Sequence, residues 1–338
     1  MEIIANDAFP RRDAEGLRRF LELCQQRATA DGAAVYASIT LRVPHIDPLA
    51  VLQSIEEPGQ AHFYLERPQG DLALAGAEPI AWATAEGPER FATLREAVTG
   101  IFDRTLAIGD MDAPMAGPRC YAALSFAGDA AAAAPFAPAT AFLPRWQVTA
   151  SDGAYTAVAN ACIEPGTDID ALARRMLAAH GKFEQFDYDH AAAPAQNAIK
   201  SLREAVGGSA AFENNVTEAL GRIADGHYEK IVLARAVDLE LQRPIAPLEW
   251  LNRLRERFPG CYSLCFNGGG PDSFIAATPE RLLKVADGHL WTEAVAGSAP
   301  RGINAREDAV RAAELLASEK NLREHRAVIA SIRTRMGT

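Results

Sequence analysis

Hydrophobic and polar residues alternate over short runs in the first 160 positions of the chain, which is the pattern of half-buried β-strands. Gly, Pro and Asp separate these runs and indicate the turns of an antiparallel meander. Strands are predicted at 35–43, 62–66, 72–75, 80–84, 120–126, 145–150 and 155–159. Helical spacing of apolar residues predicts helices at 11–29, 89–105 and 169–180.

After residue 201 the pattern changes to helix, strand, helix and a run of strands. Helices are predicted at 212–223, ending near Asp225-Gly226, and at 247–257, which begins with a proline. Further strands are predicted at 261–267, 273–277, 281–285 and 289–294. The triplet Gly268-Gly269-Gly270 lies between two of these strands and precedes no helix, so it predicts a hairpin tip and not a phosphate-binding loop.

Two charged positions stand out against this pattern. The stretch 230–240 is predicted to be a strand, in which Lys230 shares one face with Val232 and Ala234. The segment 305–338 predicts one long helix, in which Lys320 and Glu324 interrupt a stripe of small and apolar residues. Taken alone, the first is a solvated lysine at a strand entrance and the second an ordinary helix salt bridge.

Composition narrows the class of protein. The chain has 338 residues, 49% of them hydrophobic and 23% charged, as is typical of a globular protein, and a formal net charge of −10 that disfavours a nucleic-acid partner. Five scattered cysteines predict reduced thiols without a metal site. The first residues resemble neither a signal nor a transit peptide, and no apolar run reaches the ~20 residues of a membrane helix. We expect a cytoplasmic protein without membrane contact, in two halves, 1–200 and 201–338, joined through 185–197.

Four short motifs follow one another in the second half. They are Lys-Ile-Val-Leu-Ala-Arg at 230–235, Ala-Ala-Thr-Pro-Glu-Arg-Leu-Leu at 276–283, Ala-Val-Ala-Gly-Ser-Ala-Pro-Arg-Gly at 294–302 and Ser-Glu-Lys-Asn-Leu-Arg-Glu-His at 318–325. Together they resemble the chorismate-utilising enzymes, and within that family the isochorismate synthases. The resemblance implies an α+β fold with a large antiparallel β-sandwich flanked by helices. It also implies Mg2+-dependent conversion of chorismate to isochorismate, in which water adds at C2 and the C4 hydroxyl leaves.

The resemblance also implies a role for individual residues. Lys230 would be the general base and Glu280 the general acid, and Glu324 would be a Mg2+ ligand. Ala296, Gly297 and Ser298 would line the substrate, with glycine allowing close backbone approach. A lysine acts as a base near neutral pH when desolvation or positive charge lowers its proton affinity, and Val232 and Ala234 predict such shielding. Glu280 would have to stay protonated.

Two positions distinguish members of the family. Ammonia-using relatives, such as anthranilate synthase, typically carry glutamine at the position of Lys230, so lysine favours water as the nucleophile. Aminodeoxychorismate synthases typically carry a nucleophilic lysine at the position of Ala296, where alanine forms no adduct. Salicylate synthases share the base lysine and stay open as an alternative. The motif at 294–302 is most similar to that of quinone-pathway enzymes, which predicts menaquinone or phylloquinone supply.

One departure from the family opens a different alternative. In members of the family the chain continues for roughly another hundred residues. That part carries a second Mg2+ glutamate and an arginine that binds the substrate carboxylate. Because neither is present here, we expect this chain to be C-terminally incomplete. One glutamate alone would hold Mg2+ loosely, since hard cations need several oxygen ligands. A catalytically inactive remnant is therefore a second hypothesis. The sequence does not determine the oligomeric state, and a monomer is the expectation.

Overall fold

The computed structural model describes residues 1–4, 13–67, 71–128, 134–184, 199–204 and 208–337. Their contacts form two compact units. The first comprises Met1–Pro194 and Ala246–Pro279, and the second comprises Ala195–Ile245 and Glu280–Thr338. The units therefore interleave along the chain. The predicted connection 185–197 lies outside the described residues.

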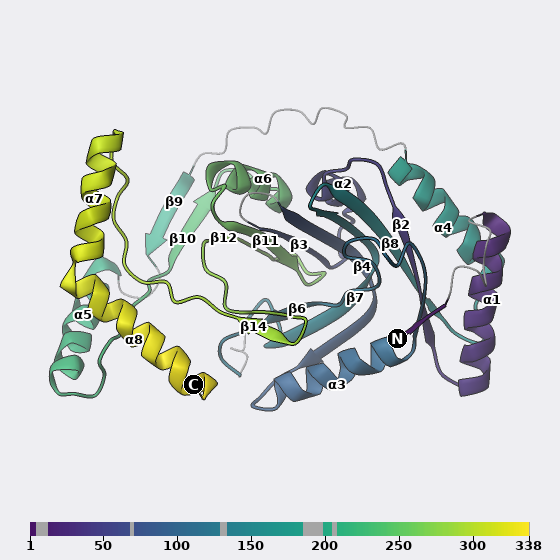
Figure 1. The fold of residues 1–338 in the computed structure, drawn as a ribbon, viewed down its shortest axis with the longest axis horizontal. Helices are drawn as coiled ribbons and strands as arrows, with labels where there is room; N and C mark the ends of the chain where they lie inside the picture. The colour runs from purple at the N-terminus through teal and green to yellow at the C-terminus, as the bar shows by residue number, and fades with distance from the viewer. Residues whose placement is uncertain (5–12, 68–70, 129–133, 185–198, 205–207, 338) are drawn as a thin grey trace. The chain divides into compact units, whose positions relative to one another are not determined.

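The first unit is built on a ten-stranded, mostly antiparallel sheet with the order β1-β5-β2-β8-β7-β4-β3-β11-β12, in which β6 also pairs with β7 (Figure 1). Only the β1–β5 and β5–β2 pairs are parallel among these described strands. The strands are β1 Glu2–Ile3, β2 Val35–Arg42, β3 His62–Glu66, β4 Leu72–Ala85, β5 Thr105–Gly109, β6 Tyr121–Leu124, β7 Ala139–Ser151, β8 Ala154–Ile163, β11 Tyr262–Asn267 and β12 Ser273–Thr278. The predicted α+β class with a large antiparallel sheet and flanking helices is confirmed.

The strands predicted separately at 72–75 and 80–84 form one strand, β4. It pairs with β7 from Leu72 opposite Ser151 to Ala85 opposite Ala139, and its register shifts between Pro79 and Ala81. Proline cannot donate a ladder hydrogen bond, and Glu78 before it adopts a left-handed φ of 58°. The irregularity at these two residues therefore looks like a turn in the sequence but bends a continuous strand.

Helices cover the sheet because each presents an apolar stripe. Figure 1 shows α1 (Ala14–Asp31) beside α4 (Ile169–Glu184), and the two enclose a core with β2 and β8 that includes Phe20, Leu21 and Ile163. Helices α2 (Pro48–Ile55) and α6 (Pro247–Arg257) share a second cluster with Tyr64 and Cys265. Helix α3 (Arg90–Asp103) packs on β4 and β7 through Leu94.

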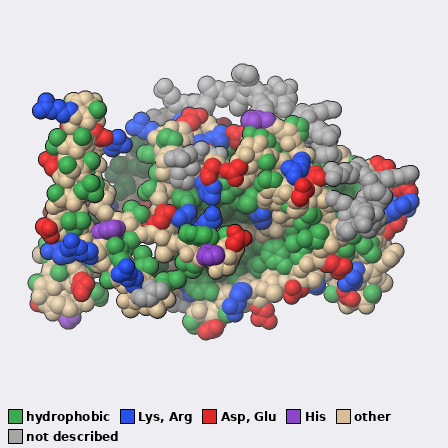
Figure 2. Space-filling view, in the orientation of Figure 1, with side chains coloured by type: hydrophobic (Ala, Val, Ile, Leu, Met, Phe, Trp, Pro, Cys, Tyr) green, Lys and Arg blue, Asp and Glu red, His purple; other side chains and the backbone are tan. Residues whose placement is uncertain are grey.

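The second unit contains two antiparallel strand pairs and three helices among its described residues. These are β9 (Ile199–Glu204) with β10 (Val237–Leu241), β13 (Lys284–Ala286) with β14 (His289–Trp291), α5 (Gly208–Ala224), α7 (Ala305–Ala317) and α8 (Glu319–Met336). Many large apolar side chains here are exposed, for example Leu316 on α7, which is 74% exposed. The space-filling view shows hydrophobic side chains scattered along α7 among charged ones (Figure 2).

Two elements of the second unit differ from the prediction. The strand predicted at 230–240 begins only at Val237, because residues 230–236 have no ladder partner among the described strands. The helix predicted over 305–338 is interrupted at Ser318, whose backbone is extended with φ −69° and ψ 108°. The Ser318 hydroxyl accepts a hydrogen bond from the backbone N–H of Asn321 at 3.4 Å, so it caps α8.

The predicted hairpin at the glycine triplet is confirmed. Strands β11 and β12 pair with Asn267 opposite Ser273, and the intervening residues form the turn. The Asn267 side chain donates to the carbonyl oxygens of Gly270 and Asp272, at 3.3 and 3.1 Å.

No described helix is long and apolar enough to cross a membrane.

One ion cluster connects α6 to α2 and β3. The Arg255 guanidinium donates to both carboxylate oxygens of Asp47 at 3.2 and 2.7 Å, and lies 3.4 Å from Glu66 Oε2. Asp47 also caps α2 by accepting from the N–H of Leu49 at 2.9 Å. Although burial alone would raise the pKa of Asp47, the hydrogen bond and charge of Arg255 hold that pKa below its usual value.

We expect Arg255→Leu to lower the free energy of unfolding of the first unit by about 2 kcal/mol, since it leaves two partly buried carboxylates without their cation. Arg257→Leu on the exposed side of the same helix is the matched control and should have little effect. The pKa of Asp47 is lower in the folded protein than its ordinary value of 3.8, so the ion pair stabilises the fold fully at pH values above 3.8. This contribution should be lost as the pH falls below 3.8 and Asp47 becomes protonated in the folded protein as well. Urea unfolding at several pH values measures the free energy of unfolding and its pH dependence. An equal decrease of this free energy in Arg255→Leu and Arg257→Leu would contradict the stabilising role of the Arg255 ion cluster.

Candidate active site

The segment 292–302 lies against the first turns of α8 in the second unit. His325 Nε2 lies 3.1 Å from the carbonyl oxygen of Ala294, which gives a hydrogen bond between helix and segment. Asn321 and His325 are one helical turn apart and lie on the same face as Glu324. This face of α8 therefore holds the backbone of the predicted substrate motif, and neither Asn321 nor His325 was among the predicted site residues.

Gly297 also lies close to α8. Its φ is +89°, a conformation that L side chains rarely adopt, and a Cβ there would lie 3.2 Å from Asn321 Cβ. The backbone conformation thus favours glycine, and a side chain there would also be in tight contact with Asn321. Beside it, Ala296 is half-buried and Ser298 is exposed.

A second anchor fixes the far end of the motif at the start of α7. The Asp308 carboxylate accepts from the Gly302 N–H at 2.8 Å and from Arg301 at 2.8 and 2.6 Å. These hydrogen bonds lower the pKa of Asp308 to about 2, with Arg301 as the main cause. The sequence contained a signal for this helix start, since Asn304 accepts from the Glu307 N–H and Glu307 from the Ile303 N–H, as in a capping box.

The same part of α8 approaches the predicted base. Lys230 Nζ lies 3.9 Å from Glu324 Oε2, and the two side chains are 30% and 32% exposed. That distance allows an ion pair but exceeds a hydrogen bond. The structure therefore brings together Lys230, Glu324 and, through Asn321 and His325 on α8, the motif at 294–298.

The predicted shielding of Lys230 is not present. Val232 is 80% exposed and Ala234 is also exposed. The prediction assumed an alternating strand face, and residues 230–236 form no strand, so no such face exists in the described structure. The half-buried position of Lys230 comes instead from its approach to α8.

Glu280 lies between β12 and the β13–β14 hairpin in the chain. It is exposed and follows β12 by two residues. Next to it Arg281 pairs with Glu293, and Thr292 donates to the carbonyl oxygen of Leu282 at 2.8 Å. These two contacts continue the pairing of the β13–β14 hairpin away from its turn. Glu280 therefore lies at the end of the hairpin opposite the turn, where the strand that follows β14 continues into 294–298. Its position relative to Lys230 stays a prediction.

The described residues offer limited donors for a metal ion. No group of three His, Cys, Asp or Glu side chains converges among them. Mg2+ is commonly bound by one or two carboxylates, with water and substrate oxygens completing its octahedron. Glu324 supplies one carboxylate, and its role as a Mg2+ ligand stays a prediction.

Comparison with known proteins identifies the family. Residues 21–338 match the family model described as "Chorismate binding enzyme". The fold is similar to that of MenF, the menaquinone-specific isochorismate synthase from Escherichia coli, with a TM-score of 0.70 over 94% of this chain and 69% of that one, at 19% sequence identity. The predicted family resemblance is confirmed.

Curated relatives are similar over different lengths. The salicylate biosynthesis isochorismate synthase of Pseudomonas aeruginosa is 27% identical over 94% of this chain and 65% of its own length. The isochorismate synthase DhbC of Bacillus subtilis is 36% identical over 35% of this chain and 31% of its own. The chain spans less than two thirds of these relatives.

Gly297→Ala should loosen the motif from α8, because alanine at this φ costs about 1–3 kcal/mol and its methyl group meets Asn321. The expected result is faster amide hydrogen exchange over 294–298 with little change in the first unit. Gly270→Ala is the control, since a Cβ there meets nothing within 4 Å. Unchanged exchange at 294–298 in Gly297→Ala would show that this contact does not hold the motif.

Proposed function

Because the chain belongs to the family of chorismate-binding enzymes, we propose that it carries out the isochorismate synthase reaction, the conversion of chorismate to isochorismate. The observation that supports this most directly is the approach of Lys230 to Glu324 on the helix face that also holds the motif at 294–298. These residues are far apart in the sequence, and each belongs to a different motif of the predicted resemblance.

The reaction assigns one proton transfer to each of two side chains. Lys230 is proposed to take a proton from water while the water oxygen bonds to C2 of the ring. Glu280, as the acid, gives a proton to the C4 hydroxyl as the C4–O bond breaks and the double bonds shift. One water enters and one leaves, so the overall change is an isomerisation.

The backbone of 296–298 is proposed to contact the substrate. Gly297 exposes backbone without a side chain, and its neighbour Ala296 leaves room where a lysine would stand in a covalent mechanism. The hydrogen bond from His325 to Ala294 and the Gly302–Asp308 anchor position this backbone from both ends. They are positioning contacts and take no part in proton transfer.

Glu324 is proposed as a Mg2+ ligand within this site. When bound, Mg2+ would supply a positive charge that holds a substrate carboxylate. A single carboxylate leaves the other coordination positions to water, substrate or further protein groups. Glu324 also lies near Lys230, so the same carboxylate contributes to the charge around the base.

The branch of metabolism is a narrower proposal. The motif at 294–302 favours menaquinone or phylloquinone supply, and the structural neighbour from E. coli is menaquinone-specific. Salicylate biosynthesis is the second candidate branch, because a relative aligned over 94% of the chain is an isochorismate synthase of that pathway. A salicylate synthase stays the alternative reaction. Cytoplasmic location and a monomeric state stay predictions.

Lys230→Ala should lower the rate of isochorismate formation from chorismate by about 10²–10⁴-fold, the usual contribution of a general base. Lys200→Ala, which removes an exposed lysine paired with Glu240 in the same unit, is the control and should keep the rate. Chromatography of the products, with and without ammonia, checks the reaction at the same time. Undiminished turnover in Lys230→Ala would show that this lysine is not the general base. Formation of anthranilate would indicate the ammonia-using reaction, and formation of salicylate with pyruvate would indicate the salicylate synthase reaction. Chorismate binding without any product in the unmodified protein would support the inactive remnant.

Glu324→Gln should weaken Mg2+ binding by at least tenfold, since it replaces a charged oxygen ligand with a neutral amide. Glu319→Gln in the first turn of the same helix is the matched control. Calorimetric titration with Mg2+ in the presence of chorismate measures the affinity directly and does not depend on turnover. Equal affinity in the two variants would exclude Glu324 as a ligand.

A further inference from the structure

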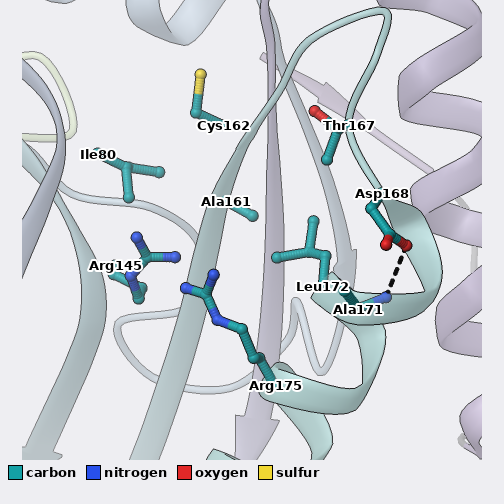
Figure 3. A pocket seen from close by; sticks show the side chains of 9 residues that line it. All are labelled: Ile80, Arg145, Ala161, Cys162, Thr167, Asp168, Ala171, Leu172 and Arg175. Atoms are coloured by element: carbon teal, nitrogen blue, oxygen red, sulfur yellow. Dashed lines mark hydrogen bonds between the residues drawn. The ribbon is translucent and has the colours of Figure 1, made fainter.

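A separate cavity of about 390 Å³ lies in the first unit, beside β8 and the start of α4 (Figure 3). One part of its wall is apolar and includes Ile80, Ala161 and Leu172. The polar part includes two arginines, Arg145 from β7 and Arg175 from α4. Its volume is within the range of small-molecule sites. None of its lining residues belongs to the proposed active site.

Arg145 is partly buried beside Glu78. Its Nε lies 3.0 Å from Glu78 Oε2, and the side chain is 25% exposed. The other carboxylate oxygen of Glu78 accepts from the indole N–H of Trp146 at 3.1 Å. Glu78 thus forms an ion pair with the Nε edge of Arg145, although Nε makes no hydrogen bond among the described residues, and Figure 3 shows the terminal nitrogens turned into the cavity.

Arg175 reaches the same space from α4. Figure 3 shows its guanidinium extended from the helix toward that of Arg145. No hydrogen bond or ion pair joins Arg175 to another residue in the part of the chain that the structure describes, and its side chain is accessible from solvent. Arg145 has Glu78 as its counter-ion, so Arg175 supplies the positive charge that favours the binding of an anion in this space.

Two acidic residues lie close to the arginines, and one of them, Asp168, lines the cavity itself. Glu78 is engaged by Arg145 and Trp146. Asp168 caps α4 by accepting from the Ala171 N–H at 2.9 Å, and Figure 3 shows its carboxylate turned toward that helix end. Its charge is balanced there by the positive end of the helix dipole.

We propose that this cavity binds a small organic carboxylate with a compact apolar body, such as an aromatic acid. Planar guanidinium groups bind a planar carboxylate through paired hydrogen bonds, and the two arginines supply the donors. The apolar wall at Ile80, Ala161 and Leu172 contacts the body of the ligand. This second binding site gives the protein a means of sensing a carboxylate other than at its active site.

Benzoate is the probe for this site, with benzamide as its neutral counterpart and inorganic phosphate as a simple anion. Calorimetry should show benzoate binding to the unmodified protein and at least tenfold weaker binding to Arg175→Leu. Arg174→Leu, the exposed neighbour on the same helix, should bind normally. Lys230→Ala should also bind normally, which separates this site from the proposed active site.

Several results would overturn the proposal. They are absence of benzoate binding at millimolar concentration, equal binding to Arg175→Leu and Arg174→Leu, or benzamide binding as tightly as benzoate. Phosphate displacing benzoate at equal concentration would likewise overturn it, because the apolar wall would then contribute nothing. Arg175→Lys gives a further check, since it keeps the charge and loses the paired hydrogen bonds, and it should bind more weakly than the unmodified protein.

Discussion

The first unit depends on one long antiparallel pairing, that of β4 with β7. It runs from Leu72 opposite Ser151 to Ala85 opposite Ala139, and each strand then carries its other neighbours, β3 on β4 and β8 and β6 on β7. Alternation along β4 directs Ala73 and Ala75 toward the cluster shared with α2 and α6, while Leu74 faces Phe142 and Phe266. The register of this pair consequently sets which residues every layer above and below it can bury.

Elements with local signals at both ends could be predicted from the sequence. Strand β3 at His62–Glu66 and helix α6 at Pro247–Arg257 have the predicted bounds. Strand β5 was missed because its apolar residues extend the helical pattern of α3, and its pairing is with distant β2. The break at Ser318 was missed because no Gly or Pro marks it, and the capping serine is also compatible with a helix interior.

The candidate site shows the same limit more sharply. Nothing local to Lys230 indicates Glu324, since the two are brought together only by the fold, and it was the order of four motifs that associated them. Pattern alone placed Lys230 on a strand face that does not form. Asn321 and His325 share a helix face with Glu324, so helical spacing could have selected them, but their contacts with 294–297 are tertiary.

The interleaving of the two units has a consequence for the growing chain. Strand β3 pairs with β11, which lies about 200 residues later. At about 5–20 residues per second, synthesis leaves the edge of β3 without this neighbour for on the order of 10–40 s. During that time its backbone N–H and C=O groups are a template for any other strand, including one from a neighbouring nascent chain. Glu66 ends β3 with a negative charge, and Arg255 that later pairs with it arrives only just ahead of β11. Glu66 therefore gains its ion-pair partner, and the edge of β3 its neighbouring strand, at nearly the same point of synthesis.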